Sequence, residues 1–442
     1  MSAYVCRPRA RFLRFAVAVL VCLFGQSVFA ATVVVGTCKN LVSFTTIQAA
    51  VNAVPSGSTI DICAGTYTEQ ININKSLTLT GVAVGTADAV VILPPGAGLS
   101  QNTTSLATSN PIAAHVWVLG PATVNMNNLI VDSLGNGQSG CGQPTLVGIL
   151  YQNASGTLNH VATRNQWIGA SESDTGSNGC QTGLGIFVQS GNSGTSTVNV
   201  TNSSVHDYQK NGITGNEPGT TINVTGSDVV GQGATNGAAE NGIQIGFGAS
   251  GTLTGNMVID DVWAPDTITD AGDAAAGILL YDTAENTSTV KNNTVGNTQF
   301  GIALVTDTSG VGDGASVTLN KVFGTRIFDA IDVCTNNNTI QTNTIMNSSE
   351  SAIHMDASCG VLDGGTSGSG NAVTGNTIVD ACTGILQDSG TSNTTVPNTY
   401  FAAGTTSGSS CTPTPTRQLS TGSKTGNARN TTNRVPYRPA RP

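Results

Sequence analysis

A short apolar motif recurs along the chain from residue 148 onward. Each copy is Gly or Ala followed by Ile, after which the residues alternate, and the copies lie 22 to 37 residues apart. A period of two is typical of a β-strand with one side in a core. The pattern therefore predicts coils with a constant core and turns of variable length. The copies are Gly148-Ile149, Gly185-Ile186, Gly212-Ile213, Gly242-Ile243, Gly277-Ile278, Gly301-Ile302, Ala330-Ile331, Ala352-Ile353 and Gly384-Ile385.

A second motif, Asn-x-Val or Asn-x-Ile, lies within the same repeat. Asn tolerates the left-handed backbone of turns, and at one position in successive coils each amide can donate to the next. We therefore expect a ladder of amide side chains along one turn of the stack. Its members are Asn256, Asn293, Asn320, Asn343 and Asn376.

The segments between these motifs predict an all-β fold. They are four to six residues long and rich in Val, Ile and Thr, and they are bounded by Gly, Asn, Ser and Asp. These are the residues that typically end strands and form the turns between them. Helical periodicity is confined to the region from Phe44 to Val54.

The segment from Phe44 to Val82, FTTIQAAVNAVPSGSTIDICAGTYTEQININKSLTLTGV, resembles the N-terminal part of right-handed parallel β-helix proteins of the pectin-lyase-like superfamily. The resemblance covers roughly residues 33 to 400. It implies a single right-handed parallel β-helix, a solenoid, whose open end is covered by a short helix from Thr46 to Ala53. An uncovered end would expose the core and a strand edge. The fold leaves the reaction undetermined, because many functions share this architecture.

The N-terminus predicts export. Four arginines precede an apolar run from Phe15 to Phe24 and a small residue at Ala30, which is the order of a secretory signal. We expect residues 1–30 to be a signal peptide cleaved after Ala30, with Ala31 as the alternative. The protein would then be secreted, periplasmic or on the cell surface, as a monomer without membrane insertion.

Charge divides the rest of the chain into an acidic body and a basic tail. Residues 31–388 hold all 26 acidic residues and only seven basic ones, whereas six basic residues and no acid follow Asp388. An acidic body excludes nucleic acid as a partner, because nucleic acid binding depends on cationic side chains. We expect residues 31–404 to form the β-helix domain and residues 405–442 to be a basic, disordered tail.

Eight cysteines remain after the signal, an even number that predicts disulfides in an exported chain. No two of them form a CxxC pair, so a zinc ribbon is excluded. Consecutive cysteines would lie on neighbouring coils, although the sequence alone does not fix their connectivity. The expected pairs are Cys38 with Cys63, Cys141 with Cys180, Cys334 with Cys359, and Cys382 with Cys411.

Known catalytic motifs are missing from the sequence. It contains no GxSxG, HExxH, P-loop or GxGxxG after a strand. The motifs of pectin methylesterases, polygalacturonases, classical pectate lyases and mannuronan epimerases have no counterpart either. The resemblance therefore implies no catalytic residues, and a non-catalytic member of the superfamily stays open as an alternative.

Strand geometry nevertheless selects one candidate site. If the Ile of each motif enters the core, the first and third residues after it face solvent. In the last three coils these positions gather acidic residues and a histidine, with successive coils about 4.8 Å apart. The four side chains predicted to project together are Asp332, His354, Asp356 and Asp388.

This arrangement suits acid-base chemistry on a glycosidic bond or an acidic C–H, because neighbouring carboxylates and histidines shift each other's proton affinity. We expect Asp332 and Asp356 to be acid-base or calcium-binding carboxylates and His354 to be a proton shuttle. Arg326 could neutralise a uronate. A second acidic group with no base among it could also take Ca²⁺, although its spacing fits no known calcium loop and favours a solvated loop. Its members are Asp260, Asp261, Asp266, Asp270 and Asp273.

Two functions remain. The first is an exported β-helix protein that binds or cleaves polysaccharide, as a lyase, hydrolase or esterase. The second is a non-catalytic extracellular or cell-surface module for structure or adhesion, which the missing motifs favour. The scarcity of Lys and Arg disfavours strongly anionic substrates unless calcium bridges the charges.

Overall fold

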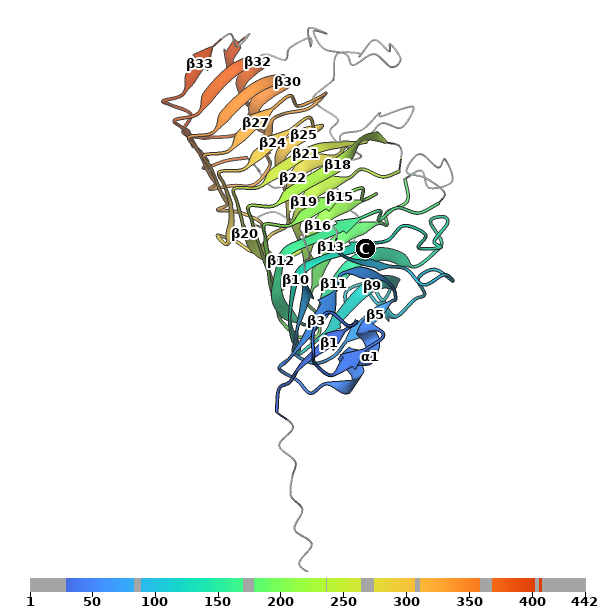
Figure 1. Cartoon of the computed structure of the whole chain (residues 1–442). Helices are drawn as coiled ribbons and strands as arrows, with labels where there is room; N and C mark the ends of the chain where they lie inside the picture. The colour runs from blue at the N-terminus through green and yellow to red at the C-terminus, as the bar shows by residue number, and fades with distance from the viewer. Residues whose placement is uncertain are drawn as a thin grey trace, which may run out of the picture.

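The computed structural model of the chain is a single solenoid of stacked coils, seen from the side in Figure 1 with its N-terminal coils in blue and its C-terminal coils in red. It describes residues 29–82, 89–169, 179–235, 237–263, 274–306, 311–357, 368–401 and 405–407. All but the last two residues of the predicted signal peptide, and almost all of the predicted tail, lie outside these residues. The all-β, right-handed parallel β-helix expected from the sequence is confirmed.

Each coil contributes strands to three parallel faces, which we call the first, second and third face. The first face contains β3 (Ser58–Cys63), β6 (Leu77–Val82), β10 (Thr123–Asp132), β12 (Ser155–Arg164), β14 (Ser196–Thr201), β17 (Thr220–Thr225), β20 (Ser250–Thr254), β23 (Ser288–Lys291), β26 (Ser316–Thr318), β29 (Thr339–Gln341) and β31 (Ala372–Thr374). The second face contains β4 (Gly65–Thr68), β7 (Val90–Leu93), β15 (Ser204–His206), β18 (Asp228–Thr235), β21 (Met257–Trp263), β24 (Thr294–Gly296), β27 (Lys321–Phe323) and β33 (Thr399–Phe401).

The third face carries the candidate site. It contains β5 (Ile71–Ile73), β9 (Pro111–Leu119), β11 (Thr145–Gln152), β13 (Leu184–Gln189), β16 (Asn211–Asn216), β19 (Asn241–Gly246), β22 (Ala276–Tyr281), β25 (Phe300–Val305), β28 (Ile331–Val333) and β34 (Thr405–Ser407). Long strands turn a corner between faces. β10 and β12 pass from the first face to the second, and β30 (Thr344–Met355) and β32 (Thr377–Gln387) pass from the second to the third.

The isoleucines of the recurrent motif form one continuous row inside the third face, as predicted. Register pairs Ile149 with Ile186 and continues coil by coil through Ile331, Ile353 and Ile385. These side chains are essentially inaccessible to solvent. The preceding glycine is required by space: a Cβ at Gly212 would lie 2.6 Å from the carbonyl oxygen of Gly242.

The predicted amide ladder is also present. Asn256 Nδ2 donates to Asn293 Oδ1 at 2.9 Å, and the same bond repeats from Asn293 to Asn320, Asn343 and Asn376. The ladder runs one coil further, to Asn398. Each backbone N–H along it also donates to the next Asn side chain, so these buried turn groups are satisfied without water.

Helix α1 (Ile47–Ala53) covers the N-terminal end, one residue shorter than predicted because Thr46 is its N-cap. The Thr46 hydroxyl accepts from the Ala49 N–H. The Glu69 carboxylate accepts from the N–H groups of Ile47 and Gln48, which have no partner inside the helix. Nearby, β1 (Thr32–Val35) pairs with β2 (Ser43–Phe44) and β3. No helix in the described part of the chain is long and apolar enough to cross a membrane.

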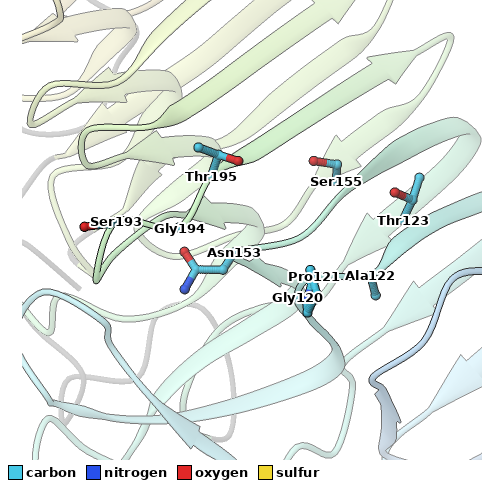
Figure 2. Close-up of a pocket in the computed structure, with 9 residues that line it drawn as sticks. All are labelled: Gly120, Pro121, Ala122, Thr123, Asn153, Ser155, Ser193, Gly194 and Thr195. Carbon is cyan, nitrogen blue, oxygen red and sulfur yellow. The ribbon is translucent and has the colours of Figure 1, made fainter.

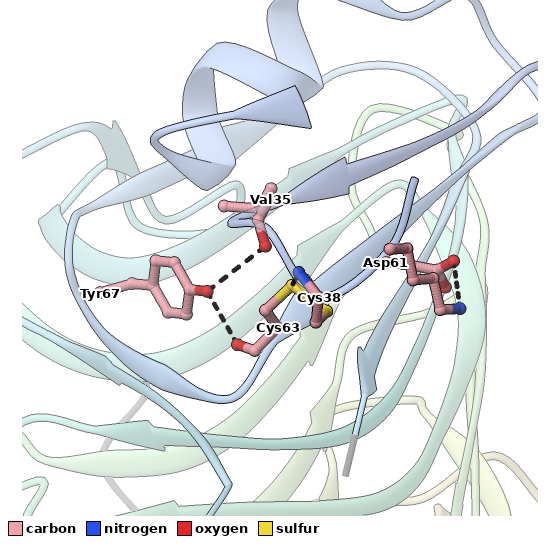
Figure 3. The surroundings of a disulfide bond; sticks show 6 residues. Val35, Cys38, Asp61, Cys63 and Tyr67 are labelled. Atoms are coloured by element: carbon pink, nitrogen blue, oxygen red, sulfur yellow. Dashed lines mark hydrogen bonds and ion pairs between the residues drawn. A yellow bond between two sulfur atoms is a disulfide. The ribbon is translucent and has the colours of Figure 1, made fainter. Parts of the chain in front are cut away.

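Two predicted disulfides are confirmed, Cys38–Cys63 and Cys141–Cys180. Figure 3 shows the first beside Tyr67, whose hydroxyl donates to the Cys63 carbonyl oxygen at 2.8 Å, and beside the ion pair of Lys39 with Asp61. Cys334 and Cys382 are disulfide-bonded as well. The partners predicted for them, Cys359 and Cys411, lie outside the described residues.

Candidate functional site

The outer side of the third face is buried, which corrects the expectation that it faces solvent. Thr214, Gln244, Leu279 and Tyr281 are directed away from the core yet are at most 2% exposed. Turn residues cover this side. Leu106 donates its N–H to Gln189 Oε1, and β8 (Thr103–Thr104) pairs antiparallel with β9. Counting positions within strands could not reveal that long turns fold back over them.

In the last coils the third face brings together the four residues predicted from the sequence. Asp332 on β28 is the direct ladder neighbour of His354 on β30. Asp356 follows β30 and Asp388 follows β32, and their N–H groups extend the ladder to the carbonyls of Val333 and Met355. Ligand oxygens of Asp332 and Asp356 lie within 4.8 Å of each other.

Burial differs sharply among these side chains. Asp332, His354 and Asp356 are 4%, 1% and 0% exposed, whereas the Asp388 side chain is 25% exposed. Within this group only Asp388 can therefore meet a solvent-borne molecule directly.

His354 lies at the centre of the cluster. Its Nδ1 is 3.1 Å from Asp329 Oδ2, and its Nε2 is 3.2 Å from Asp388 Oδ1. Asp332 Oδ1 and Asp356 Oδ2 are each 3.9 Å from Nδ1. The imidazole thus connects a fully buried carboxylate with the half-buried one at the edge.

Asp329 is the member that the sequence did not predict. It lies in the turn before β28, is completely buried, and accepts from the Ser351 N–H at 2.9 Å as well as from His354. Because it precedes the strand, a count outward from Ile331 does not reach it. An acid directly before an Ala-Ile motif was the available signal.

The cluster keeps His354 protonated. Burial alone would lower the pKa of His354, but the charges of Asp329 and Asp356 and the hydrogen bonds to Asp329 and Asp388 outweigh it and raise that pKa well above its ordinary value. For Asp388, burial opposes ionisation, but the hydrogen bond and charge of His354 and the N–H of Ala357 together lower its pKa. An imidazolium therefore holds the edge carboxylate ionised.

Three carboxylates remain as the natural ligands for a metal. Close groups of ligand atoms include Asp332, Cys334 and Asp356, and also His354, Asp356 and Asp388. A protonated imidazole has no lone pair for a metal, and Cys334 is disulfide-bonded. Its sulfur, 3.8 Å from Asp332 Oδ2, is accordingly neither a thiolate ligand nor a hydrogen-bond donor. The oxygens of Asp332 and Asp356, or those of Asp356 and Asp388, are therefore the close pairs that a hard cation such as Ca²⁺ would take.

Arg326 lies in the turn between β27 and β28, where its N–H donates to the Thr298 carbonyl at 2.8 Å. It is half-buried, and none of the ion pairs among the described residues includes it. The contacts in this part of the chain therefore do not connect Arg326 with the cluster.

The second acidic group is not a solvated loop where the structure describes it. Asp261 is fully buried and accepts a hydrogen bond from the Tyr208 hydroxyl. Burial raises the pKa of Asp261 well above its ordinary value, so it packs in the interior as an uncharged acid. Asp266, Asp270 and Asp273 lie outside the described residues.

Comparison with solved structures finds the same fold. A GH136 lacto-N-biosidase from Eubacterium ramulus matches over 84% of this chain and 67% of its own, with a TM-score of 0.59 and 11% identity. A second structure of that enzyme gives a TM-score of 0.52 at 12% identity, with coverage of 85% and 67%. A periplasmic alginate epimerase matches over 77% of this chain and 70% of its own, at a TM-score of 0.47 and 12% identity.

No protein-family model matches the sequence, and no curated protein matches it. Similarity at such low identity shows the fold alone. The chain has the parallel β-helix architecture expected from its resemblance to the pectin-lyase-like superfamily.

Proposed function

We propose that this right-handed parallel β-helix protein is exported and acts on polysaccharide, with Asp388 as the group that contacts the substrate. The observation that carries this is the position of Asp388: its carboxylate is 25% exposed, and directly beneath it the buried imidazole of His354 lies at 3.2 Å. Perturbed titratable groups in such surroundings are typical of reaction sites.

Hydrolysis of a glycosidic bond is the reaction that Asp388, with the imidazole of His354 behind it, suits best. Glycosidases use two carboxyl groups, one to protonate the leaving oxygen and one to activate water or stabilise the sugar cation. Here Asp388 is the one carboxylate of the cluster at the surface, so in this scheme it serves in both roles. Water would add to the anomeric carbon as the C–O bond breaks, with Asp388 taking the proton of that water and returning it through a solvent molecule to the leaving oxygen.

The buried residues act through Asp388 in this scheme. Asp332 and Asp356 are too buried to touch a polysaccharide, so we assign them, with His354 and Asp329, to positioning and to setting the charge of Asp388. The contact with substrate is thus assigned to Asp388, which follows β32, instead of to Asp332 and Asp356 as expected from the sequence.

A non-catalytic extracellular module is the second candidate. It is favoured by the burial of Asp329, Asp332, His354 and Asp356. A buried cluster whose members bond mostly to one another can have a purely structural role, in which it holds neighbouring coils together. In that case Asp388 would be an edge residue without a reaction.

The test is release of reducing ends or of unsaturated uronate from plant, algal and bacterial polysaccharides, with added calcium or with chelator. Wild-type protein is compared with Asp388→Asn and with Asp228→Asn, which removes an exposed carboxylate on β18. We expect Asp388→Asn to lose at least about 100-fold in turnover and Asp228→Asn to retain it. Equal activity of all three proteins would remove Asp388 from the reaction, and no turnover on any substrate would favour the non-catalytic module.

A further inference from the structure

A separate hollow of about 530 Å³ lies where the turns enter the first face at β10, β12 and β14. Its volume falls within the range of small-ligand sites. Figure 2 shows Thr123, Ser155 and Thr195 near one another, with Asn153 and Ser193 beside them. No lining residue carries a charge. The lining consists of Gly120, Pro121, Ala122, Thr123, Asn153, Ser155, Ser193, Gly194 and Thr195.

The walls of the hollow are held by backbone hydrogen bonds. Gly120 N–H donates to the Gln152 carbonyl at 2.8 Å, Asn153 N–H to that of Gln189 at 3.0 Å, and Ser155 N–H to that of Ala122 at 3.0 Å. A Cβ at Gly120 would lie 1.5 Å from the carbonyl oxygen of Asn153, so only glycine permits this close approach. The site is therefore formed before any ligand arrives.

Several polar groups of the lining face solvent or keep hydrogen-bonding capacity that no contact within the protein uses. Thr123, Ser193 and Thr195 are exposed. Ser155 Oγ accepts from the Thr197 N–H at 3.0 Å, which leaves its hydroxyl proton for a ligand. Asn153 Oδ1 accepts from the Gly191 N–H at 2.9 Å, which leaves its NH₂ group as a donor.

The hollow continues into one long row of uncharged side chains on the first face. Thr123 and Ser155 are direct ladder neighbours, and beyond them an outward row of hydroxyl and amide side chains repeats at the coil spacing of about 4.8 Å. All members of this row are uncharged. The row contains Thr78, Asn125, Thr157, Asn199, Asn223, Thr252, Thr289, Ser316 and Thr339.

We infer that the hollow and the adjoining row bind a neutral saccharide chain, with one end of the chain in the hollow. Closely spaced donors and acceptors suit a ligand that is itself dense in hydroxyl groups. The lining has no cation for a uronate, sulfate or phosphate and no acid for a basic partner. Repeating polar side chains along the face match a partner that also repeats.

This site goes beyond the proposed function, because it lies far from Asp388. The hollow opens at the coils of β11 and β13, and β16, β19, β22 and β25 separate these from β28 on the third face. A saccharide here would be held rather than cleaved.

The test is isothermal titration of the full-length mature protein with cellohexaose, mannohexaose, chitohexaose and a hexamer of galacturonic acid. The variants Thr123→Asp and Thr195→Asp place a charge in the hollow at exposed positions. Thr66→Asp is the matched control, because Thr66 is an exposed threonine on β4 of the second face, away from the hollow and the row.

We expect at least one neutral hexasaccharide to bind, the uronate hexamer not to bind, and both hollow variants to lose at least about tenfold in affinity, or 1.4 kcal/mol. Thr66→Asp should bind like the wild type. No binding of any neutral sugar, or equal affinity of all variants, would overturn the site. Asp388→Asn should bind normally, so failure of this site and failure of the proposed reaction are separate results.

Discussion

Asp329 and His354 meet at 3.1 Å between Oδ2 and Nδ1, although 25 residues separate them in the chain. Neither side chain is accessible to solvent. The contact places a carboxylate behind the imidazole while Asp388 lies at the other nitrogen. A protonated His354 therefore donates one N–H to each carboxylate, and the ionisation of Asp388 depends on a residue that never reaches the surface.

Replacing Asp329 by Asn should lower the pKa of His354. The amide oxygen can still accept from Nδ1, but the negative charge that favours the imidazolium is gone. The measurement is an NMR titration of the imidazole in wild type, Asp329→Asn and Asp228→Asn. An unchanged His354 titration in Asp329→Asn would show that the Asp329 charge does not act on this ring, whereas Asp228→Asn should leave it unchanged.

Stability should depend on pH through His354. Because its pKa is raised in the folded protein, its contribution is fully present below its unfolded value of about 6.5 and is lost as pH rises through the folded pKa. Asp388 has the opposite sign. Its lowered pKa adds stability above about pH 3.9, which is lost as pH falls through the folded value.

Denaturant unfolding between pH 5 and 10, compared between wild type and His354→Gln, measures the first effect. The decline of unfolding free energy on the alkaline side should be shallower in the variant. Parallel curves would contradict a charged His354. The test compares the slopes of unfolding free energy against pH, so a lower overall stability of the variant does not affect the result.

Removal of one rung from the asparagine ladder should be costly. Asn320→Ala takes the acceptor from both the backbone N–H and the Nδ2 of Asn293, and buried donors without a partner cost about 1–3 kcal/mol each. We expect a loss of at least about 2 kcal/mol in the free energy of unfolding. Asn127→Ala, at a half-buried outward position on β10, should stay within about 0.5 kcal/mol.

Gly212 of the recurrent motif should not tolerate a methyl group, although two other copies of the motif carry alanine. A Cβ at Gly212 would lie 2.5 Å from Val229 Cγ1 and 2.6 Å from the Gly242 oxygen, and such overpacking costs about 1–3 kcal/mol. Gly96→Ala is the control, since nothing lies within 4 Å of its Cβ position. Equal melting temperatures of the two variants would show that the coil spacing adapts to the extra atom.

The sequence predicted the parts of the molecule that repeat. The isoleucine row and the asparagine ladder follow from period and position alone, since a coil must return to the same register for either motif to align. The gathering of Asp332, His354, Asp356 and Asp388 follows from the same count. The alternation of residues along a strand determines whether a side chain points toward or away from the core. The register between successive coils determines which side chains lie next to it.

What the sequence did not predict depends on turns. Asp332 and His354 are buried although alternation directs them away from the core, and position in a strand does not tell whether other chain lies over a side chain. Asp329 was missed because it lies before its strand. Asp261 was assigned to a solvated loop because its partner, Tyr208, is 53 residues away, beyond any local pattern.

The asparagine ladder also gives the stack a direction. Every rung from Asn256 to Asn376 donates two protons to the Asn side chain of the next coil. The other Nδ2 proton goes to a backbone carbonyl of the previous coil, so the bonds between Asn side chains all run one way. A coil is therefore incomplete until its C-terminal neighbour has formed. During synthesis, a nascent chain that has emerged only as far as Asn293 would present two unmet donors at its growing edge, and the arrival of Asn320 would satisfy both at once.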